Sequence, residues 1–123
     1  MFLGELEKKV MDILWATRGS LSVRAVTQKL NRAGKKSYAY TTVLTILTRL
    51  FVKKIVNRTR HDRGFLYSAA QTQSDFFRSV SQDLLRQLRV HFGDAAVAHF
   101  VDGIEHIDPE QLQKWRNMIN KHS

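Results

Sequence analysis

The stretch from Tyr38 to Lys54 reads YAYTTVLTILTRLFVKK, and it decides the fold of the chain. When it is placed on a helix at about 100° per residue, its apolar side chains fall on one broad arc that we expect to face the core: Tyr40, Val43, Leu44, Ile46, Leu47, Leu50 and Phe51. The opposite arc carries the polar side chains: Thr41, Thr42, Thr45, Thr48 and Arg49. Threonine is β-branched and costs a helix roughly 0.5 kcal/mol at each position. This face therefore indicates a use other than helix stability.

The threonine face is suited to close contact with a DNA groove. Threonine hydroxyls reach phosphates and base edges, a threonine methyl can meet the methyl of thymine, and an arginine adds a cation. A threonine face that is simply exposed to solvent is the alternative. The helix alone does not separate the two interpretations, so the decision depends on charge and on the neighbouring elements.

The charge of the chain points to a polyanionic partner. Of 123 residues, 20 are Lys or Arg and 11 are Asp or Glu, which gives a net charge of +9. Such a surplus favours nucleic acid first and an anionic membrane surface second. Residues 1–70 hold 14 basic and four acidic side chains, whereas residues 71–123 hold six and seven. We therefore predict a DNA-binding domain over residues 1–70 and a second domain with another task over residues 71–123.

Several classes of protein are disfavoured by what the sequence lacks. Without cysteine it has no disulfide, thiolate nucleophile or cysteine metal site. There is no bilayer-length apolar run and no secretory signal pattern, so we expect a cytoplasmic protein without membrane insertion. No catalytic constellation or glycine-rich phosphate loop is present, so we expect neither an enzyme nor a cofactor. His91, His99 and His106 fall near one another on a helical projection, but glycines interrupt it, and we expect no metal site.

The order of elements in residues 1–70 predicts a winged helix-turn-helix domain. Two amphipathic helices, over 3–16 and 23–31, precede the threonine-faced helix, and Ser22 can cap the second. Residues 20–22 are too short for an element of their own. Two β-rich runs, 55–60 and 65–69, flank a four-residue connection and predict a hairpin, the wing. The third helix would enter the major groove, with further contacts from Lys35, Lys36, Arg60, His61 and Arg63. A generic α+β domain with a solvated hairpin is the alternative.

Residues 71–123 predict three helices with more apolar surface than they can bury among themselves. The first ends near His91, the second spans about 95–103, and the third opens on the capping signal Asp108-Pro109. A unit of this size buries its surface poorly, so we expect a homodimer, with packing onto residues 1–70 as the alternative. The expected interface residues are Phe76, Phe77, Val80, Leu84, Leu88, Phe100, Trp115 and Ile119. The fold class is mainly α (α+β): a winged helix-turn-helix domain followed by a three-helix dimerisation domain.

Several motifs resemble those of the penicillinase-repressor family (BlaI/MecI type). Tyr40-Thr41-Thr42-Val43 followed by Leu47-Thr48-Arg49-Leu50 resembles its recognition helix. The first helix and the wing also match, through Leu14-Trp15 and through Arg63-Gly64-Phe65-Leu66-Tyr67. The stretch from Leu112 to Lys121 resembles the last helix of the family. The resemblance covers nearly the whole chain.

The resemblance implies a dimeric repressor that binds double-stranded dyad operators upstream of antibiotic-resistance or stress genes. In studied members a membrane sensor protease triggers cleavage of an Asn-Phe bond in the dimerisation domain, and the matching pair here looks like His99-Phe100. The copper-responsive branch of the family binds metal through C-terminal cysteines, which this chain lacks. Two other functions stay open at this point: a sequence-independent architectural DNA-binding protein, and a winged-helix regulator that senses a ligand or binds another protein.

Overall fold

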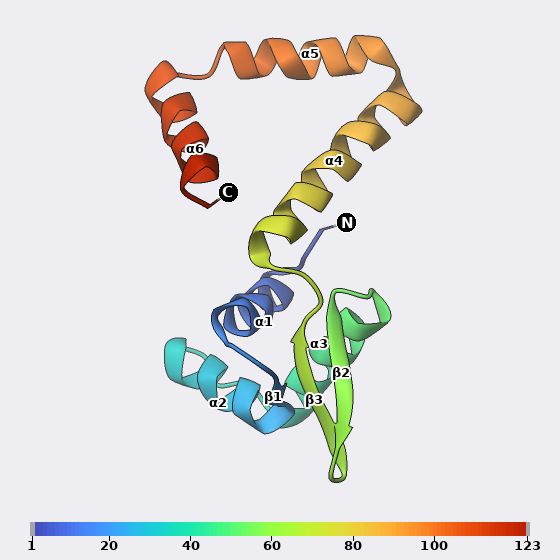
Figure 1. The fold of residues 1–123 in the computed structure, drawn as a ribbon, viewed down its shortest axis with the longest axis vertical. Coiled ribbons are helices and arrows are strands. Elements are labelled where there is room, and N and C mark those ends of the chain that lie inside the picture. Colours follow the sequence, from blue (N-terminus) through green and yellow to red (C-terminus); the bar gives the residue numbers. More distant parts are fainter. Residues whose placement is uncertain (1, 123) are drawn as a thin grey trace. The chain divides into compact units, whose positions relative to one another are not determined.

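The computed structural model describes residues 2–122, with side chains as far as Asn120. The chain divides into two compact units, residues 2–73 and the residues from Ser74 onward, and each is described by itself. Figure 1 shows the order of elements along the chain. Three helices and a small sheet form the first unit, and three successive helices dominate the second. The structure therefore confirms the predicted fold class, mainly helical with a small β component.

The N-terminal unit has the element order of a winged helix. It comprises α1 (Glu5–Ala16), β1 (Leu21–Ser22), α2 (Val23–Ala33), α3 (Tyr40–Val52), β2 (Val56–His61) and β3 (Gly64–Ala69). The sheet is antiparallel with the strand order β1-β3-β2. Pairing of β2 with β3 extends to His61 opposite Gly64, so the wing turns over two residues only.

The strand β1 was not expected from the sequence. Leu21 pairs with Tyr67 and Ser22 with Leu66, so two residues form the outer strand of the sheet. Our expectation that residues 20–22 form no element was wrong, because a two-residue strand exists only through its distant partner. Ser22 also caps α2 as predicted, since its Oγ accepts a hydrogen bond from the Ala25 amide at 3.1 Å.

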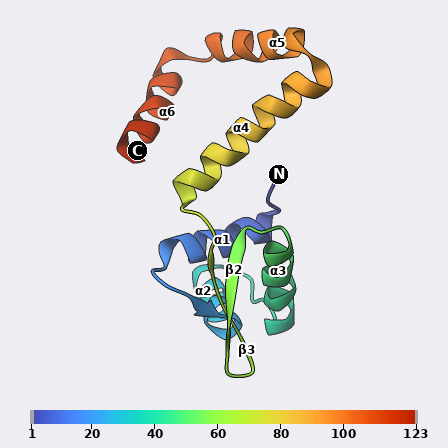
Figure 2. The ribbon, with the colours of Figure 1, turned by 45° about the vertical axis from the view of Figure 1, so that its right-hand side comes forward.

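The core of this unit is formed by one face of each helix and by the inner side of the sheet. Its completely or almost completely buried side chains come from all three helices and both long strands: Val10, Met11, Val26, Leu30, Val43, Leu47, Leu50, Val56 and Tyr67. Figure 2 and Figure 1 agree in placing α3 alongside β2, and residues of these two elements are in contact. This shared core thus fixes the position of the wing relative to α3.

The C-terminal end of α3 closes with a Schellman arrangement that uses lysine instead of glycine. The Ile55 amide donates to the Leu50 carbonyl at 3.0 Å, and the Lys54 amide donates to the Phe51 carbonyl at 2.9 Å. Lys54 adopts the left-handed conformation, with φ of 66°. Glycine is the residue that takes this position without steric cost, so Lys54 holds backbone strain at the exit from α3.

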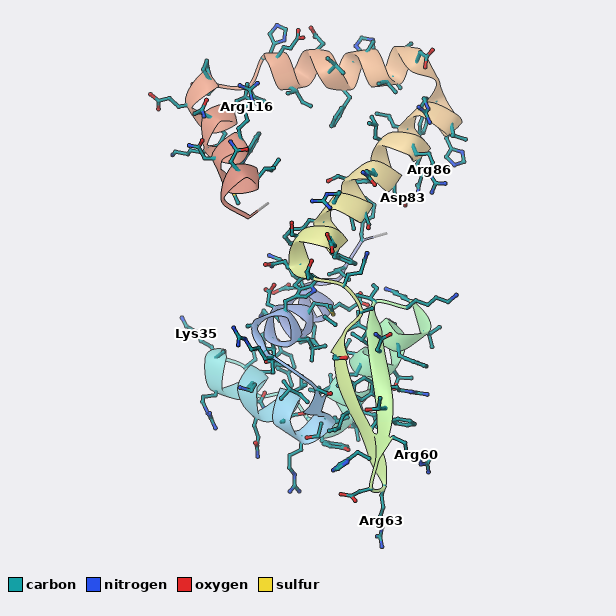
Figure 3. The ribbon with its side chains drawn as sticks, in the orientation of Figure 1. Lys35, Arg60, Arg63, Asp83, Arg86 and Arg116 are labelled. Carbon is teal, nitrogen blue, oxygen red and sulfur yellow. The ribbon has the colours of Figure 1, made fainter. Side chains whose placement is uncertain are left out.

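The C-terminal unit consists of α4 (Gln73–Phe92), α5 (Asp94–Glu105) and α6 (Pro109–His122). Gly93, with φ of 86°, separates α4 from α5. The predicted cap of α6 is present, because Asp108 Oδ1 accepts a hydrogen bond from the Glu110 amide at 3.4 Å. Polar side chains on α4 pair within the helix, as Asp83 does with Arg86 (Figure 3) and with Gln87. Arg86 and Gln87 lower the pKa of Asp83, mainly through the hydrogen bond from Arg86.

The apolar side chains of this unit are mostly exposed. No residue of α5 is buried, and Phe76 is the buried residue of α4. The exposed large apolar side chains of the three helices are Phe77, Leu84, Leu85, Val90, Phe92, Phe100, Val101, Ile104, Trp115, Met118 and Ile119. An exposed apolar surface of this extent is typical of a protein interface.

Candidate nucleic-acid interface

The outer face of α3 gathers the five polar residues that were expected to contact DNA. Thr41, Thr42, Thr45, Thr48 and Arg49 are all exposed. The Thr45 hydroxyl donates a hydrogen bond to the Thr41 carbonyl at 2.9 Å. Because this bond uses the hydroxyl proton within the helix, Thr45 can offer its oxygen as an acceptor and its methyl as an apolar contact to a ligand.

Two residues that we expected in the core lie at the surface of α3 instead. The side chain of Tyr40 is 51% exposed and that of Leu44 is 37% exposed. Val43, Ile46, Leu47 and Leu50 are the buried residues of α3. The contacts with α1, α2 and β2 cover a narrower arc of the helix than its apolar side chains occupy. The expected inward orientation of Tyr40 and Leu44 was therefore wrong.

A partly buried ion pair connects the C-terminal end of α3 to α1. Glu7 is only 6% exposed, and its Oε2 lies 2.9 Å from Lys53 Nζ. Its Oε1 accepts a hydrogen bond from the Gly4 amide at 2.9 Å. Burial raises the pKa of Glu7, but the Gly4 amide, Lys53 and Arg49 together lower it below its ordinary value. Glu7 is therefore an ionised anchor for the end of α3.

The N-terminal approach to α3 is held by one side chain of α2. Asn31 Nδ2 donates to the Tyr38 carbonyl at 3.0 Å, and the Tyr38 amide donates to Asn31 Oδ1 at 2.7 Å. Both backbone polar groups of Tyr38 are thus satisfied by Asn31. The turn between α2 and α3, which carries the exposed Lys35 and Lys36, is fixed where it enters α3.

The base of the wing is joined to α3 by an arginine between two aromatic rings. The guanidinium carbon of Arg58 lies 3.9 Å from the ring centre of Phe51 and 4.1 Å from that of Phe65. Phe51 belongs to α3, Arg58 to β2 and Phe65 to β3, so one cation–π stack joins all three elements. Arg58 therefore positions the wing against α3.

The cations of the wing do not all share one face. Residues two apart in a strand lie on the same side, so Arg60 lies on the face of Arg58, and His61 lies on the other. Arg63 lies in the turn and extends from the tip of the hairpin (Figure 3). Figure 3 also shows Lys35 well away from Arg60 and Arg63. The threonines and Arg49 are thus gathered on α3, whereas the remaining cations are spread around the unit.

Three positioning residues, Glu7, Asn31 and Arg58, were missed in the sequence. The spacing of Glu7, Val10, Met11 and Leu14 is that of a buried helical stripe, and an acid in such a stripe needs a cation nearby. The pairing of Arg60 with Phe65 follows from the hairpin and places Arg58 diagonally across from Phe65. No local pattern brings Phe51 or Tyr38 into these contacts.

Most residues expected at a dimer interface are exposed in the single chain. Phe77, Leu84, Phe100, Trp115 and Ile119 are exposed, whereas Phe76 is 8% exposed. Val80 and Leu88 are half-buried. The pair His99-Phe100 lies in the interior of α5, and both side chains are exposed.

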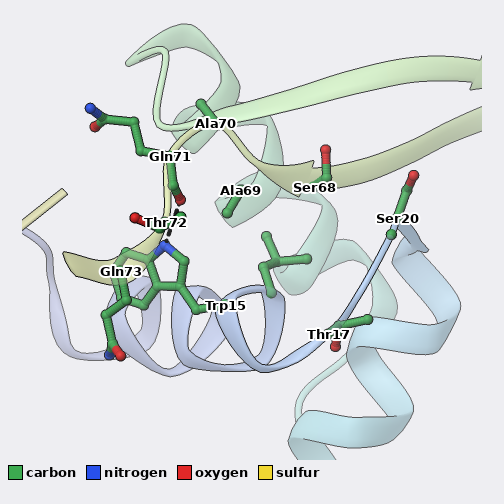
Figure 4. Close-up of a pocket in the computed structure, with 11 residues that line it drawn as sticks. Trp15, Thr17, Ser20, Ser68, Ala69, Ala70, Gln71, Thr72 and Gln73 are labelled. Atoms are coloured by element: carbon green, nitrogen blue, oxygen red, sulfur yellow. Dashed lines mark hydrogen bonds between the residues drawn. The ribbon is translucent and has the colours of Figure 1, made fainter. Parts of the chain in front are cut away.

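An open groove of about 500 Å³ lies beside the C-terminal end of α1 (Figure 4). It is lined by Leu14, Trp15, Thr17, Gly19, Ser20 and residues 68–73. Trp15 Nε1 donates a hydrogen bond to the Gln71 carbonyl at 3.2 Å across this groove. The lining is uncharged, so the groove is not an extension of the cationic surface.

The described residues also bear on metal binding and on membrane insertion. Among the side chains that the structure describes, those of residues 2–120, no three His, Asp or Glu are grouped so that they could hold a metal ion. None of the helices in that range is both long and apolar enough to cross a bilayer.

The three helices, the wing and the polar outer face of α3 define a winged-helix DNA-binding regulator. A sequence profile of the penicillinase repressor family matches residues 3–121. Transcriptional regulator BlaI of Mycobacterium tuberculosis is 33% identical over 113 residues, covering 91% of this chain and 80% of that protein. Methicillin resistance regulatory protein MecI of Staphylococcus aureus is 23% identical over 119 residues, covering 97% of this chain and 94% of that protein. The solution structure of the DNA binding domain of the repressor BlaI has a TM-score of 0.51 and 26% identity, covering 59% of this chain and 85% of that one.

The chain belongs to the penicillinase repressor family. It is a DNA-binding transcriptional repressor and not an enzyme. These findings confirm the family resemblance and the prediction of a DNA-binding repressor.

Proposed function

We propose that two copies of the chain bind a dyad operator in the cytoplasm and block transcription from it. The DNA-binding domain is residues 1–70, and the dimerisation domain is residues 71–123. Each copy inserts α3 into a major groove, where Thr41, Thr42, Thr45, Thr48 and Arg49 contact bases and backbone. The exposed polar face of α3 is the observation that carries the proposal, because those threonines contribute nothing to the core.

The cations around α3 supply affinity that does not depend on sequence. Lys35, Lys36, Arg60, His61 and Arg63 are exposed and can reach phosphates on either side of the groove. With four or five phosphate contacts in each subunit, log K should fall with log salt concentration at a slope of roughly −7 to −9. A slope near zero in a sample that binds well would contradict this part of the proposal.

The dimer is proposed to form through α4, α5 and α6. Their exposed apolar side chains include Phe77, Leu84 and Phe100, and each large one that becomes fully buried contributes about 1.5–3 kcal/mol. Two-fold pairing would present two copies of α3 to half-sites about 34 Å apart, or at a multiple of that distance. Phe76, Val80, Leu88, Trp115 and Ile119 complete the proposed interface.

The first experiment is footprinting on the DNA upstream of the protein's own coding region, with random duplex as competitor. A protected two-fold site that survives competition is the expected result. Binding that is lost equally to random duplex would favour an architectural protein instead.

In the same assay Thr45→Ala should relax sequence preference, whereas Arg60→Ala should weaken binding to all sequences alike. Equal effects of the two substitutions would contradict the proposed division of roles.

Release from the operator is proposed to follow cleavage within α5, triggered by a membrane sensor protease. Both side chains of the pair His99-Phe100 are exposed, but a helical backbone must open locally before a protease can bind it. Immunoblotting during induction in the native cell tests this step. A repressor that stays full-length while its target gene is expressed would exclude cleavage as the cause of release.

A further inference from the structure

Two apolar side chains in the first half of α3 lie at the margin of its threonine face and have no role in the core. Tyr40 and Leu44 are 51% and 37% exposed. They are four residues apart, so they are neighbours on the helix surface. On the helical projection Leu44 borders Thr48 and Thr41, and Tyr40 lies one turn before Leu44. A lone exposed apolar side chain is common, but this pair is adjacent to the residues proposed to read DNA.

The surroundings of this pair favour a nucleic-acid contact over a protein or lipid contact. On the helical projection the exposed Thr48 and Thr41 lie next to Leu44, within a domain of 14 basic and four acidic residues. In the major groove, the one apolar group on the edges of the bases is the C5-methyl of thymine. Positions four apart on a helix are separated by about 6 Å, and successive bases of a strand by about 3.4 Å. Two side chains at this spacing can therefore reach methyl groups one or two base steps apart.

We infer that Leu44, with Tyr40 beside it, selects thymine in each half-site through contact with the 5-methyl group. This inference rests on the proposed function and adds an apolar determinant to the hydroxyl and guanidinium groups already assigned. Burial of one methyl group contributes about fourfold to affinity. A dimer that makes the contact in both half-sites should gain about 15-fold.

The experiment compares the footprinted operator with duplexes in which deoxyuridine replaces thymine, one symmetric pair of positions at a time. Deoxyuridine keeps base pairing and the O4 acceptor and lacks only the methyl. The full-length wild type should lose about 15-fold affinity at one or two positions, and Leu44→Ala should bind both duplexes equally there. Leu44→Met, which keeps an apolar side chain of similar reach, should retain the loss. When the ratio of the two affinities in wild type is compared with the same ratio in Leu44→Ala, effects of deoxyuridine on DNA itself cancel.

Three outcomes would overturn the inference. The first is a wild type that prefers the operator but binds every deoxyuridine duplex as tightly. The second is a Leu44→Ala variant that loses as much affinity on deoxyuridine substitution as wild type does. Either result excludes the thymine contact and leaves the proposed repressor function unaffected. The third is a footprinted site that has no thymine where α3 binds, which would also exclude the thymine contact. If wild type binds operator and random duplex alike, the proposed function fails as well. Circular dichroism of Leu44→Ala, a substitution at a partly exposed position, checks that the variant is folded.

Discussion

The two units of the chain differ in how far their apolar side chains are buried. In the N-terminal unit Val10, Leu47 and Tyr67 are at most 1% exposed, whereas in the C-terminal unit Phe92 and Ile119 are at least 70% exposed. Their charges differ as well, with the excess of basic residues confined to residues 1–70. A domain that binds a polyanion can complete its own core and reserve its surface for ligand. A domain that binds a second copy, as proposed for the C-terminal unit, has a core that is completed only in the dimer.

The largest expected effect comes from a charge placed on the exposed apolar surface of α4. Leu84→Asp would bury an unpaired carboxylate twice in a two-fold interface, at a cost of several kcal/mol for each copy. We expect the dissociation constant of the dimer to rise by at least about 100-fold, as measured by sedimentation equilibrium. Gln82→Asp, on the exposed polar side of the same helix, is the matched control and should leave the dimer intact. Equal dissociation constants for the two variants would show that α4 lies outside the interface.

A second test uses the two tryptophans, Trp15 and Trp115, one in each unit. In a Trp115→Phe background, Leu47→Ala should lower the stability reported by Trp15 by about 2–5 kcal/mol, at every protein concentration. In a Trp15→Phe background, the urea midpoint reported by Trp115 should rise with protein concentration, because dimerisation stabilises that unit. Midpoints for Trp115 that do not depend on concentration would remove the proposed contrast between the units.

A third test concerns the ion pair of Glu7 inside the N-terminal unit. Its lowered pKa means that the ionised form stabilises the fold above the ordinary value of 4.5, and that this stabilisation is lost as pH falls through the lower folded-state pKa. Glu7→Gln should reduce the free energy of unfolding at pH 7 by about 1–3 kcal/mol, and the difference from wild type should shrink below pH 4.5. The exposed Glu5 pairs with Lys9 at 3.7 Å, and Glu5→Gln should change little. If the loss of unfolding free energy in Glu7→Gln does not vary with pH, the contribution of Glu7 is not electrostatic.

The smallest effect is a gain in stability at the exit from α3. Lys54→Gly should relieve the left-handed strain and stabilise the unit by about 1 kcal/mol, which raises the melting temperature by about 4–8 °C in a domain of this size. Lys54→Ala removes the same charge but keeps a Cβ, and it should give no gain. If both variants gain equally, charge and not backbone strain is the cause.

The sequence predicted the features that depend on local pattern and missed those that depend on distant contacts. The caps at Ser22 and Asp108 and the presence of the hairpin were predicted from a few adjacent residues, although the predicted four-residue connection of the hairpin is two residues long in the structure. By contrast, β1 needs Tyr67 and Leu66 as partners, and the stack around Arg58 needs Phe51 from another element. Neither contact produces a periodic pattern in the sequence.

The error at Tyr40 and Leu44 has a different origin. Helical periodicity gives the direction of an apolar face, but it does not give the width of the surface that packs against it. Four residues of α3 are enough to fill the space between α1, α2 and β2, so the apolar side chains at the margin stay exposed. On a helix that meets a ligand, such marginal residues are candidates for specificity.

The two hydrogen bonds between Asn31 and the backbone of Tyr38 have a thermodynamic consequence for operator binding. The segment that leads into α3 is already ordered in the free protein, so its loss of conformational entropy belongs to folding and not to association. Binding then involves no local disorder-to-order transition at this turn. The heat-capacity change of association should accordingly match the apolar surface covered by DNA, with no additional contribution from folding of residues 34–39.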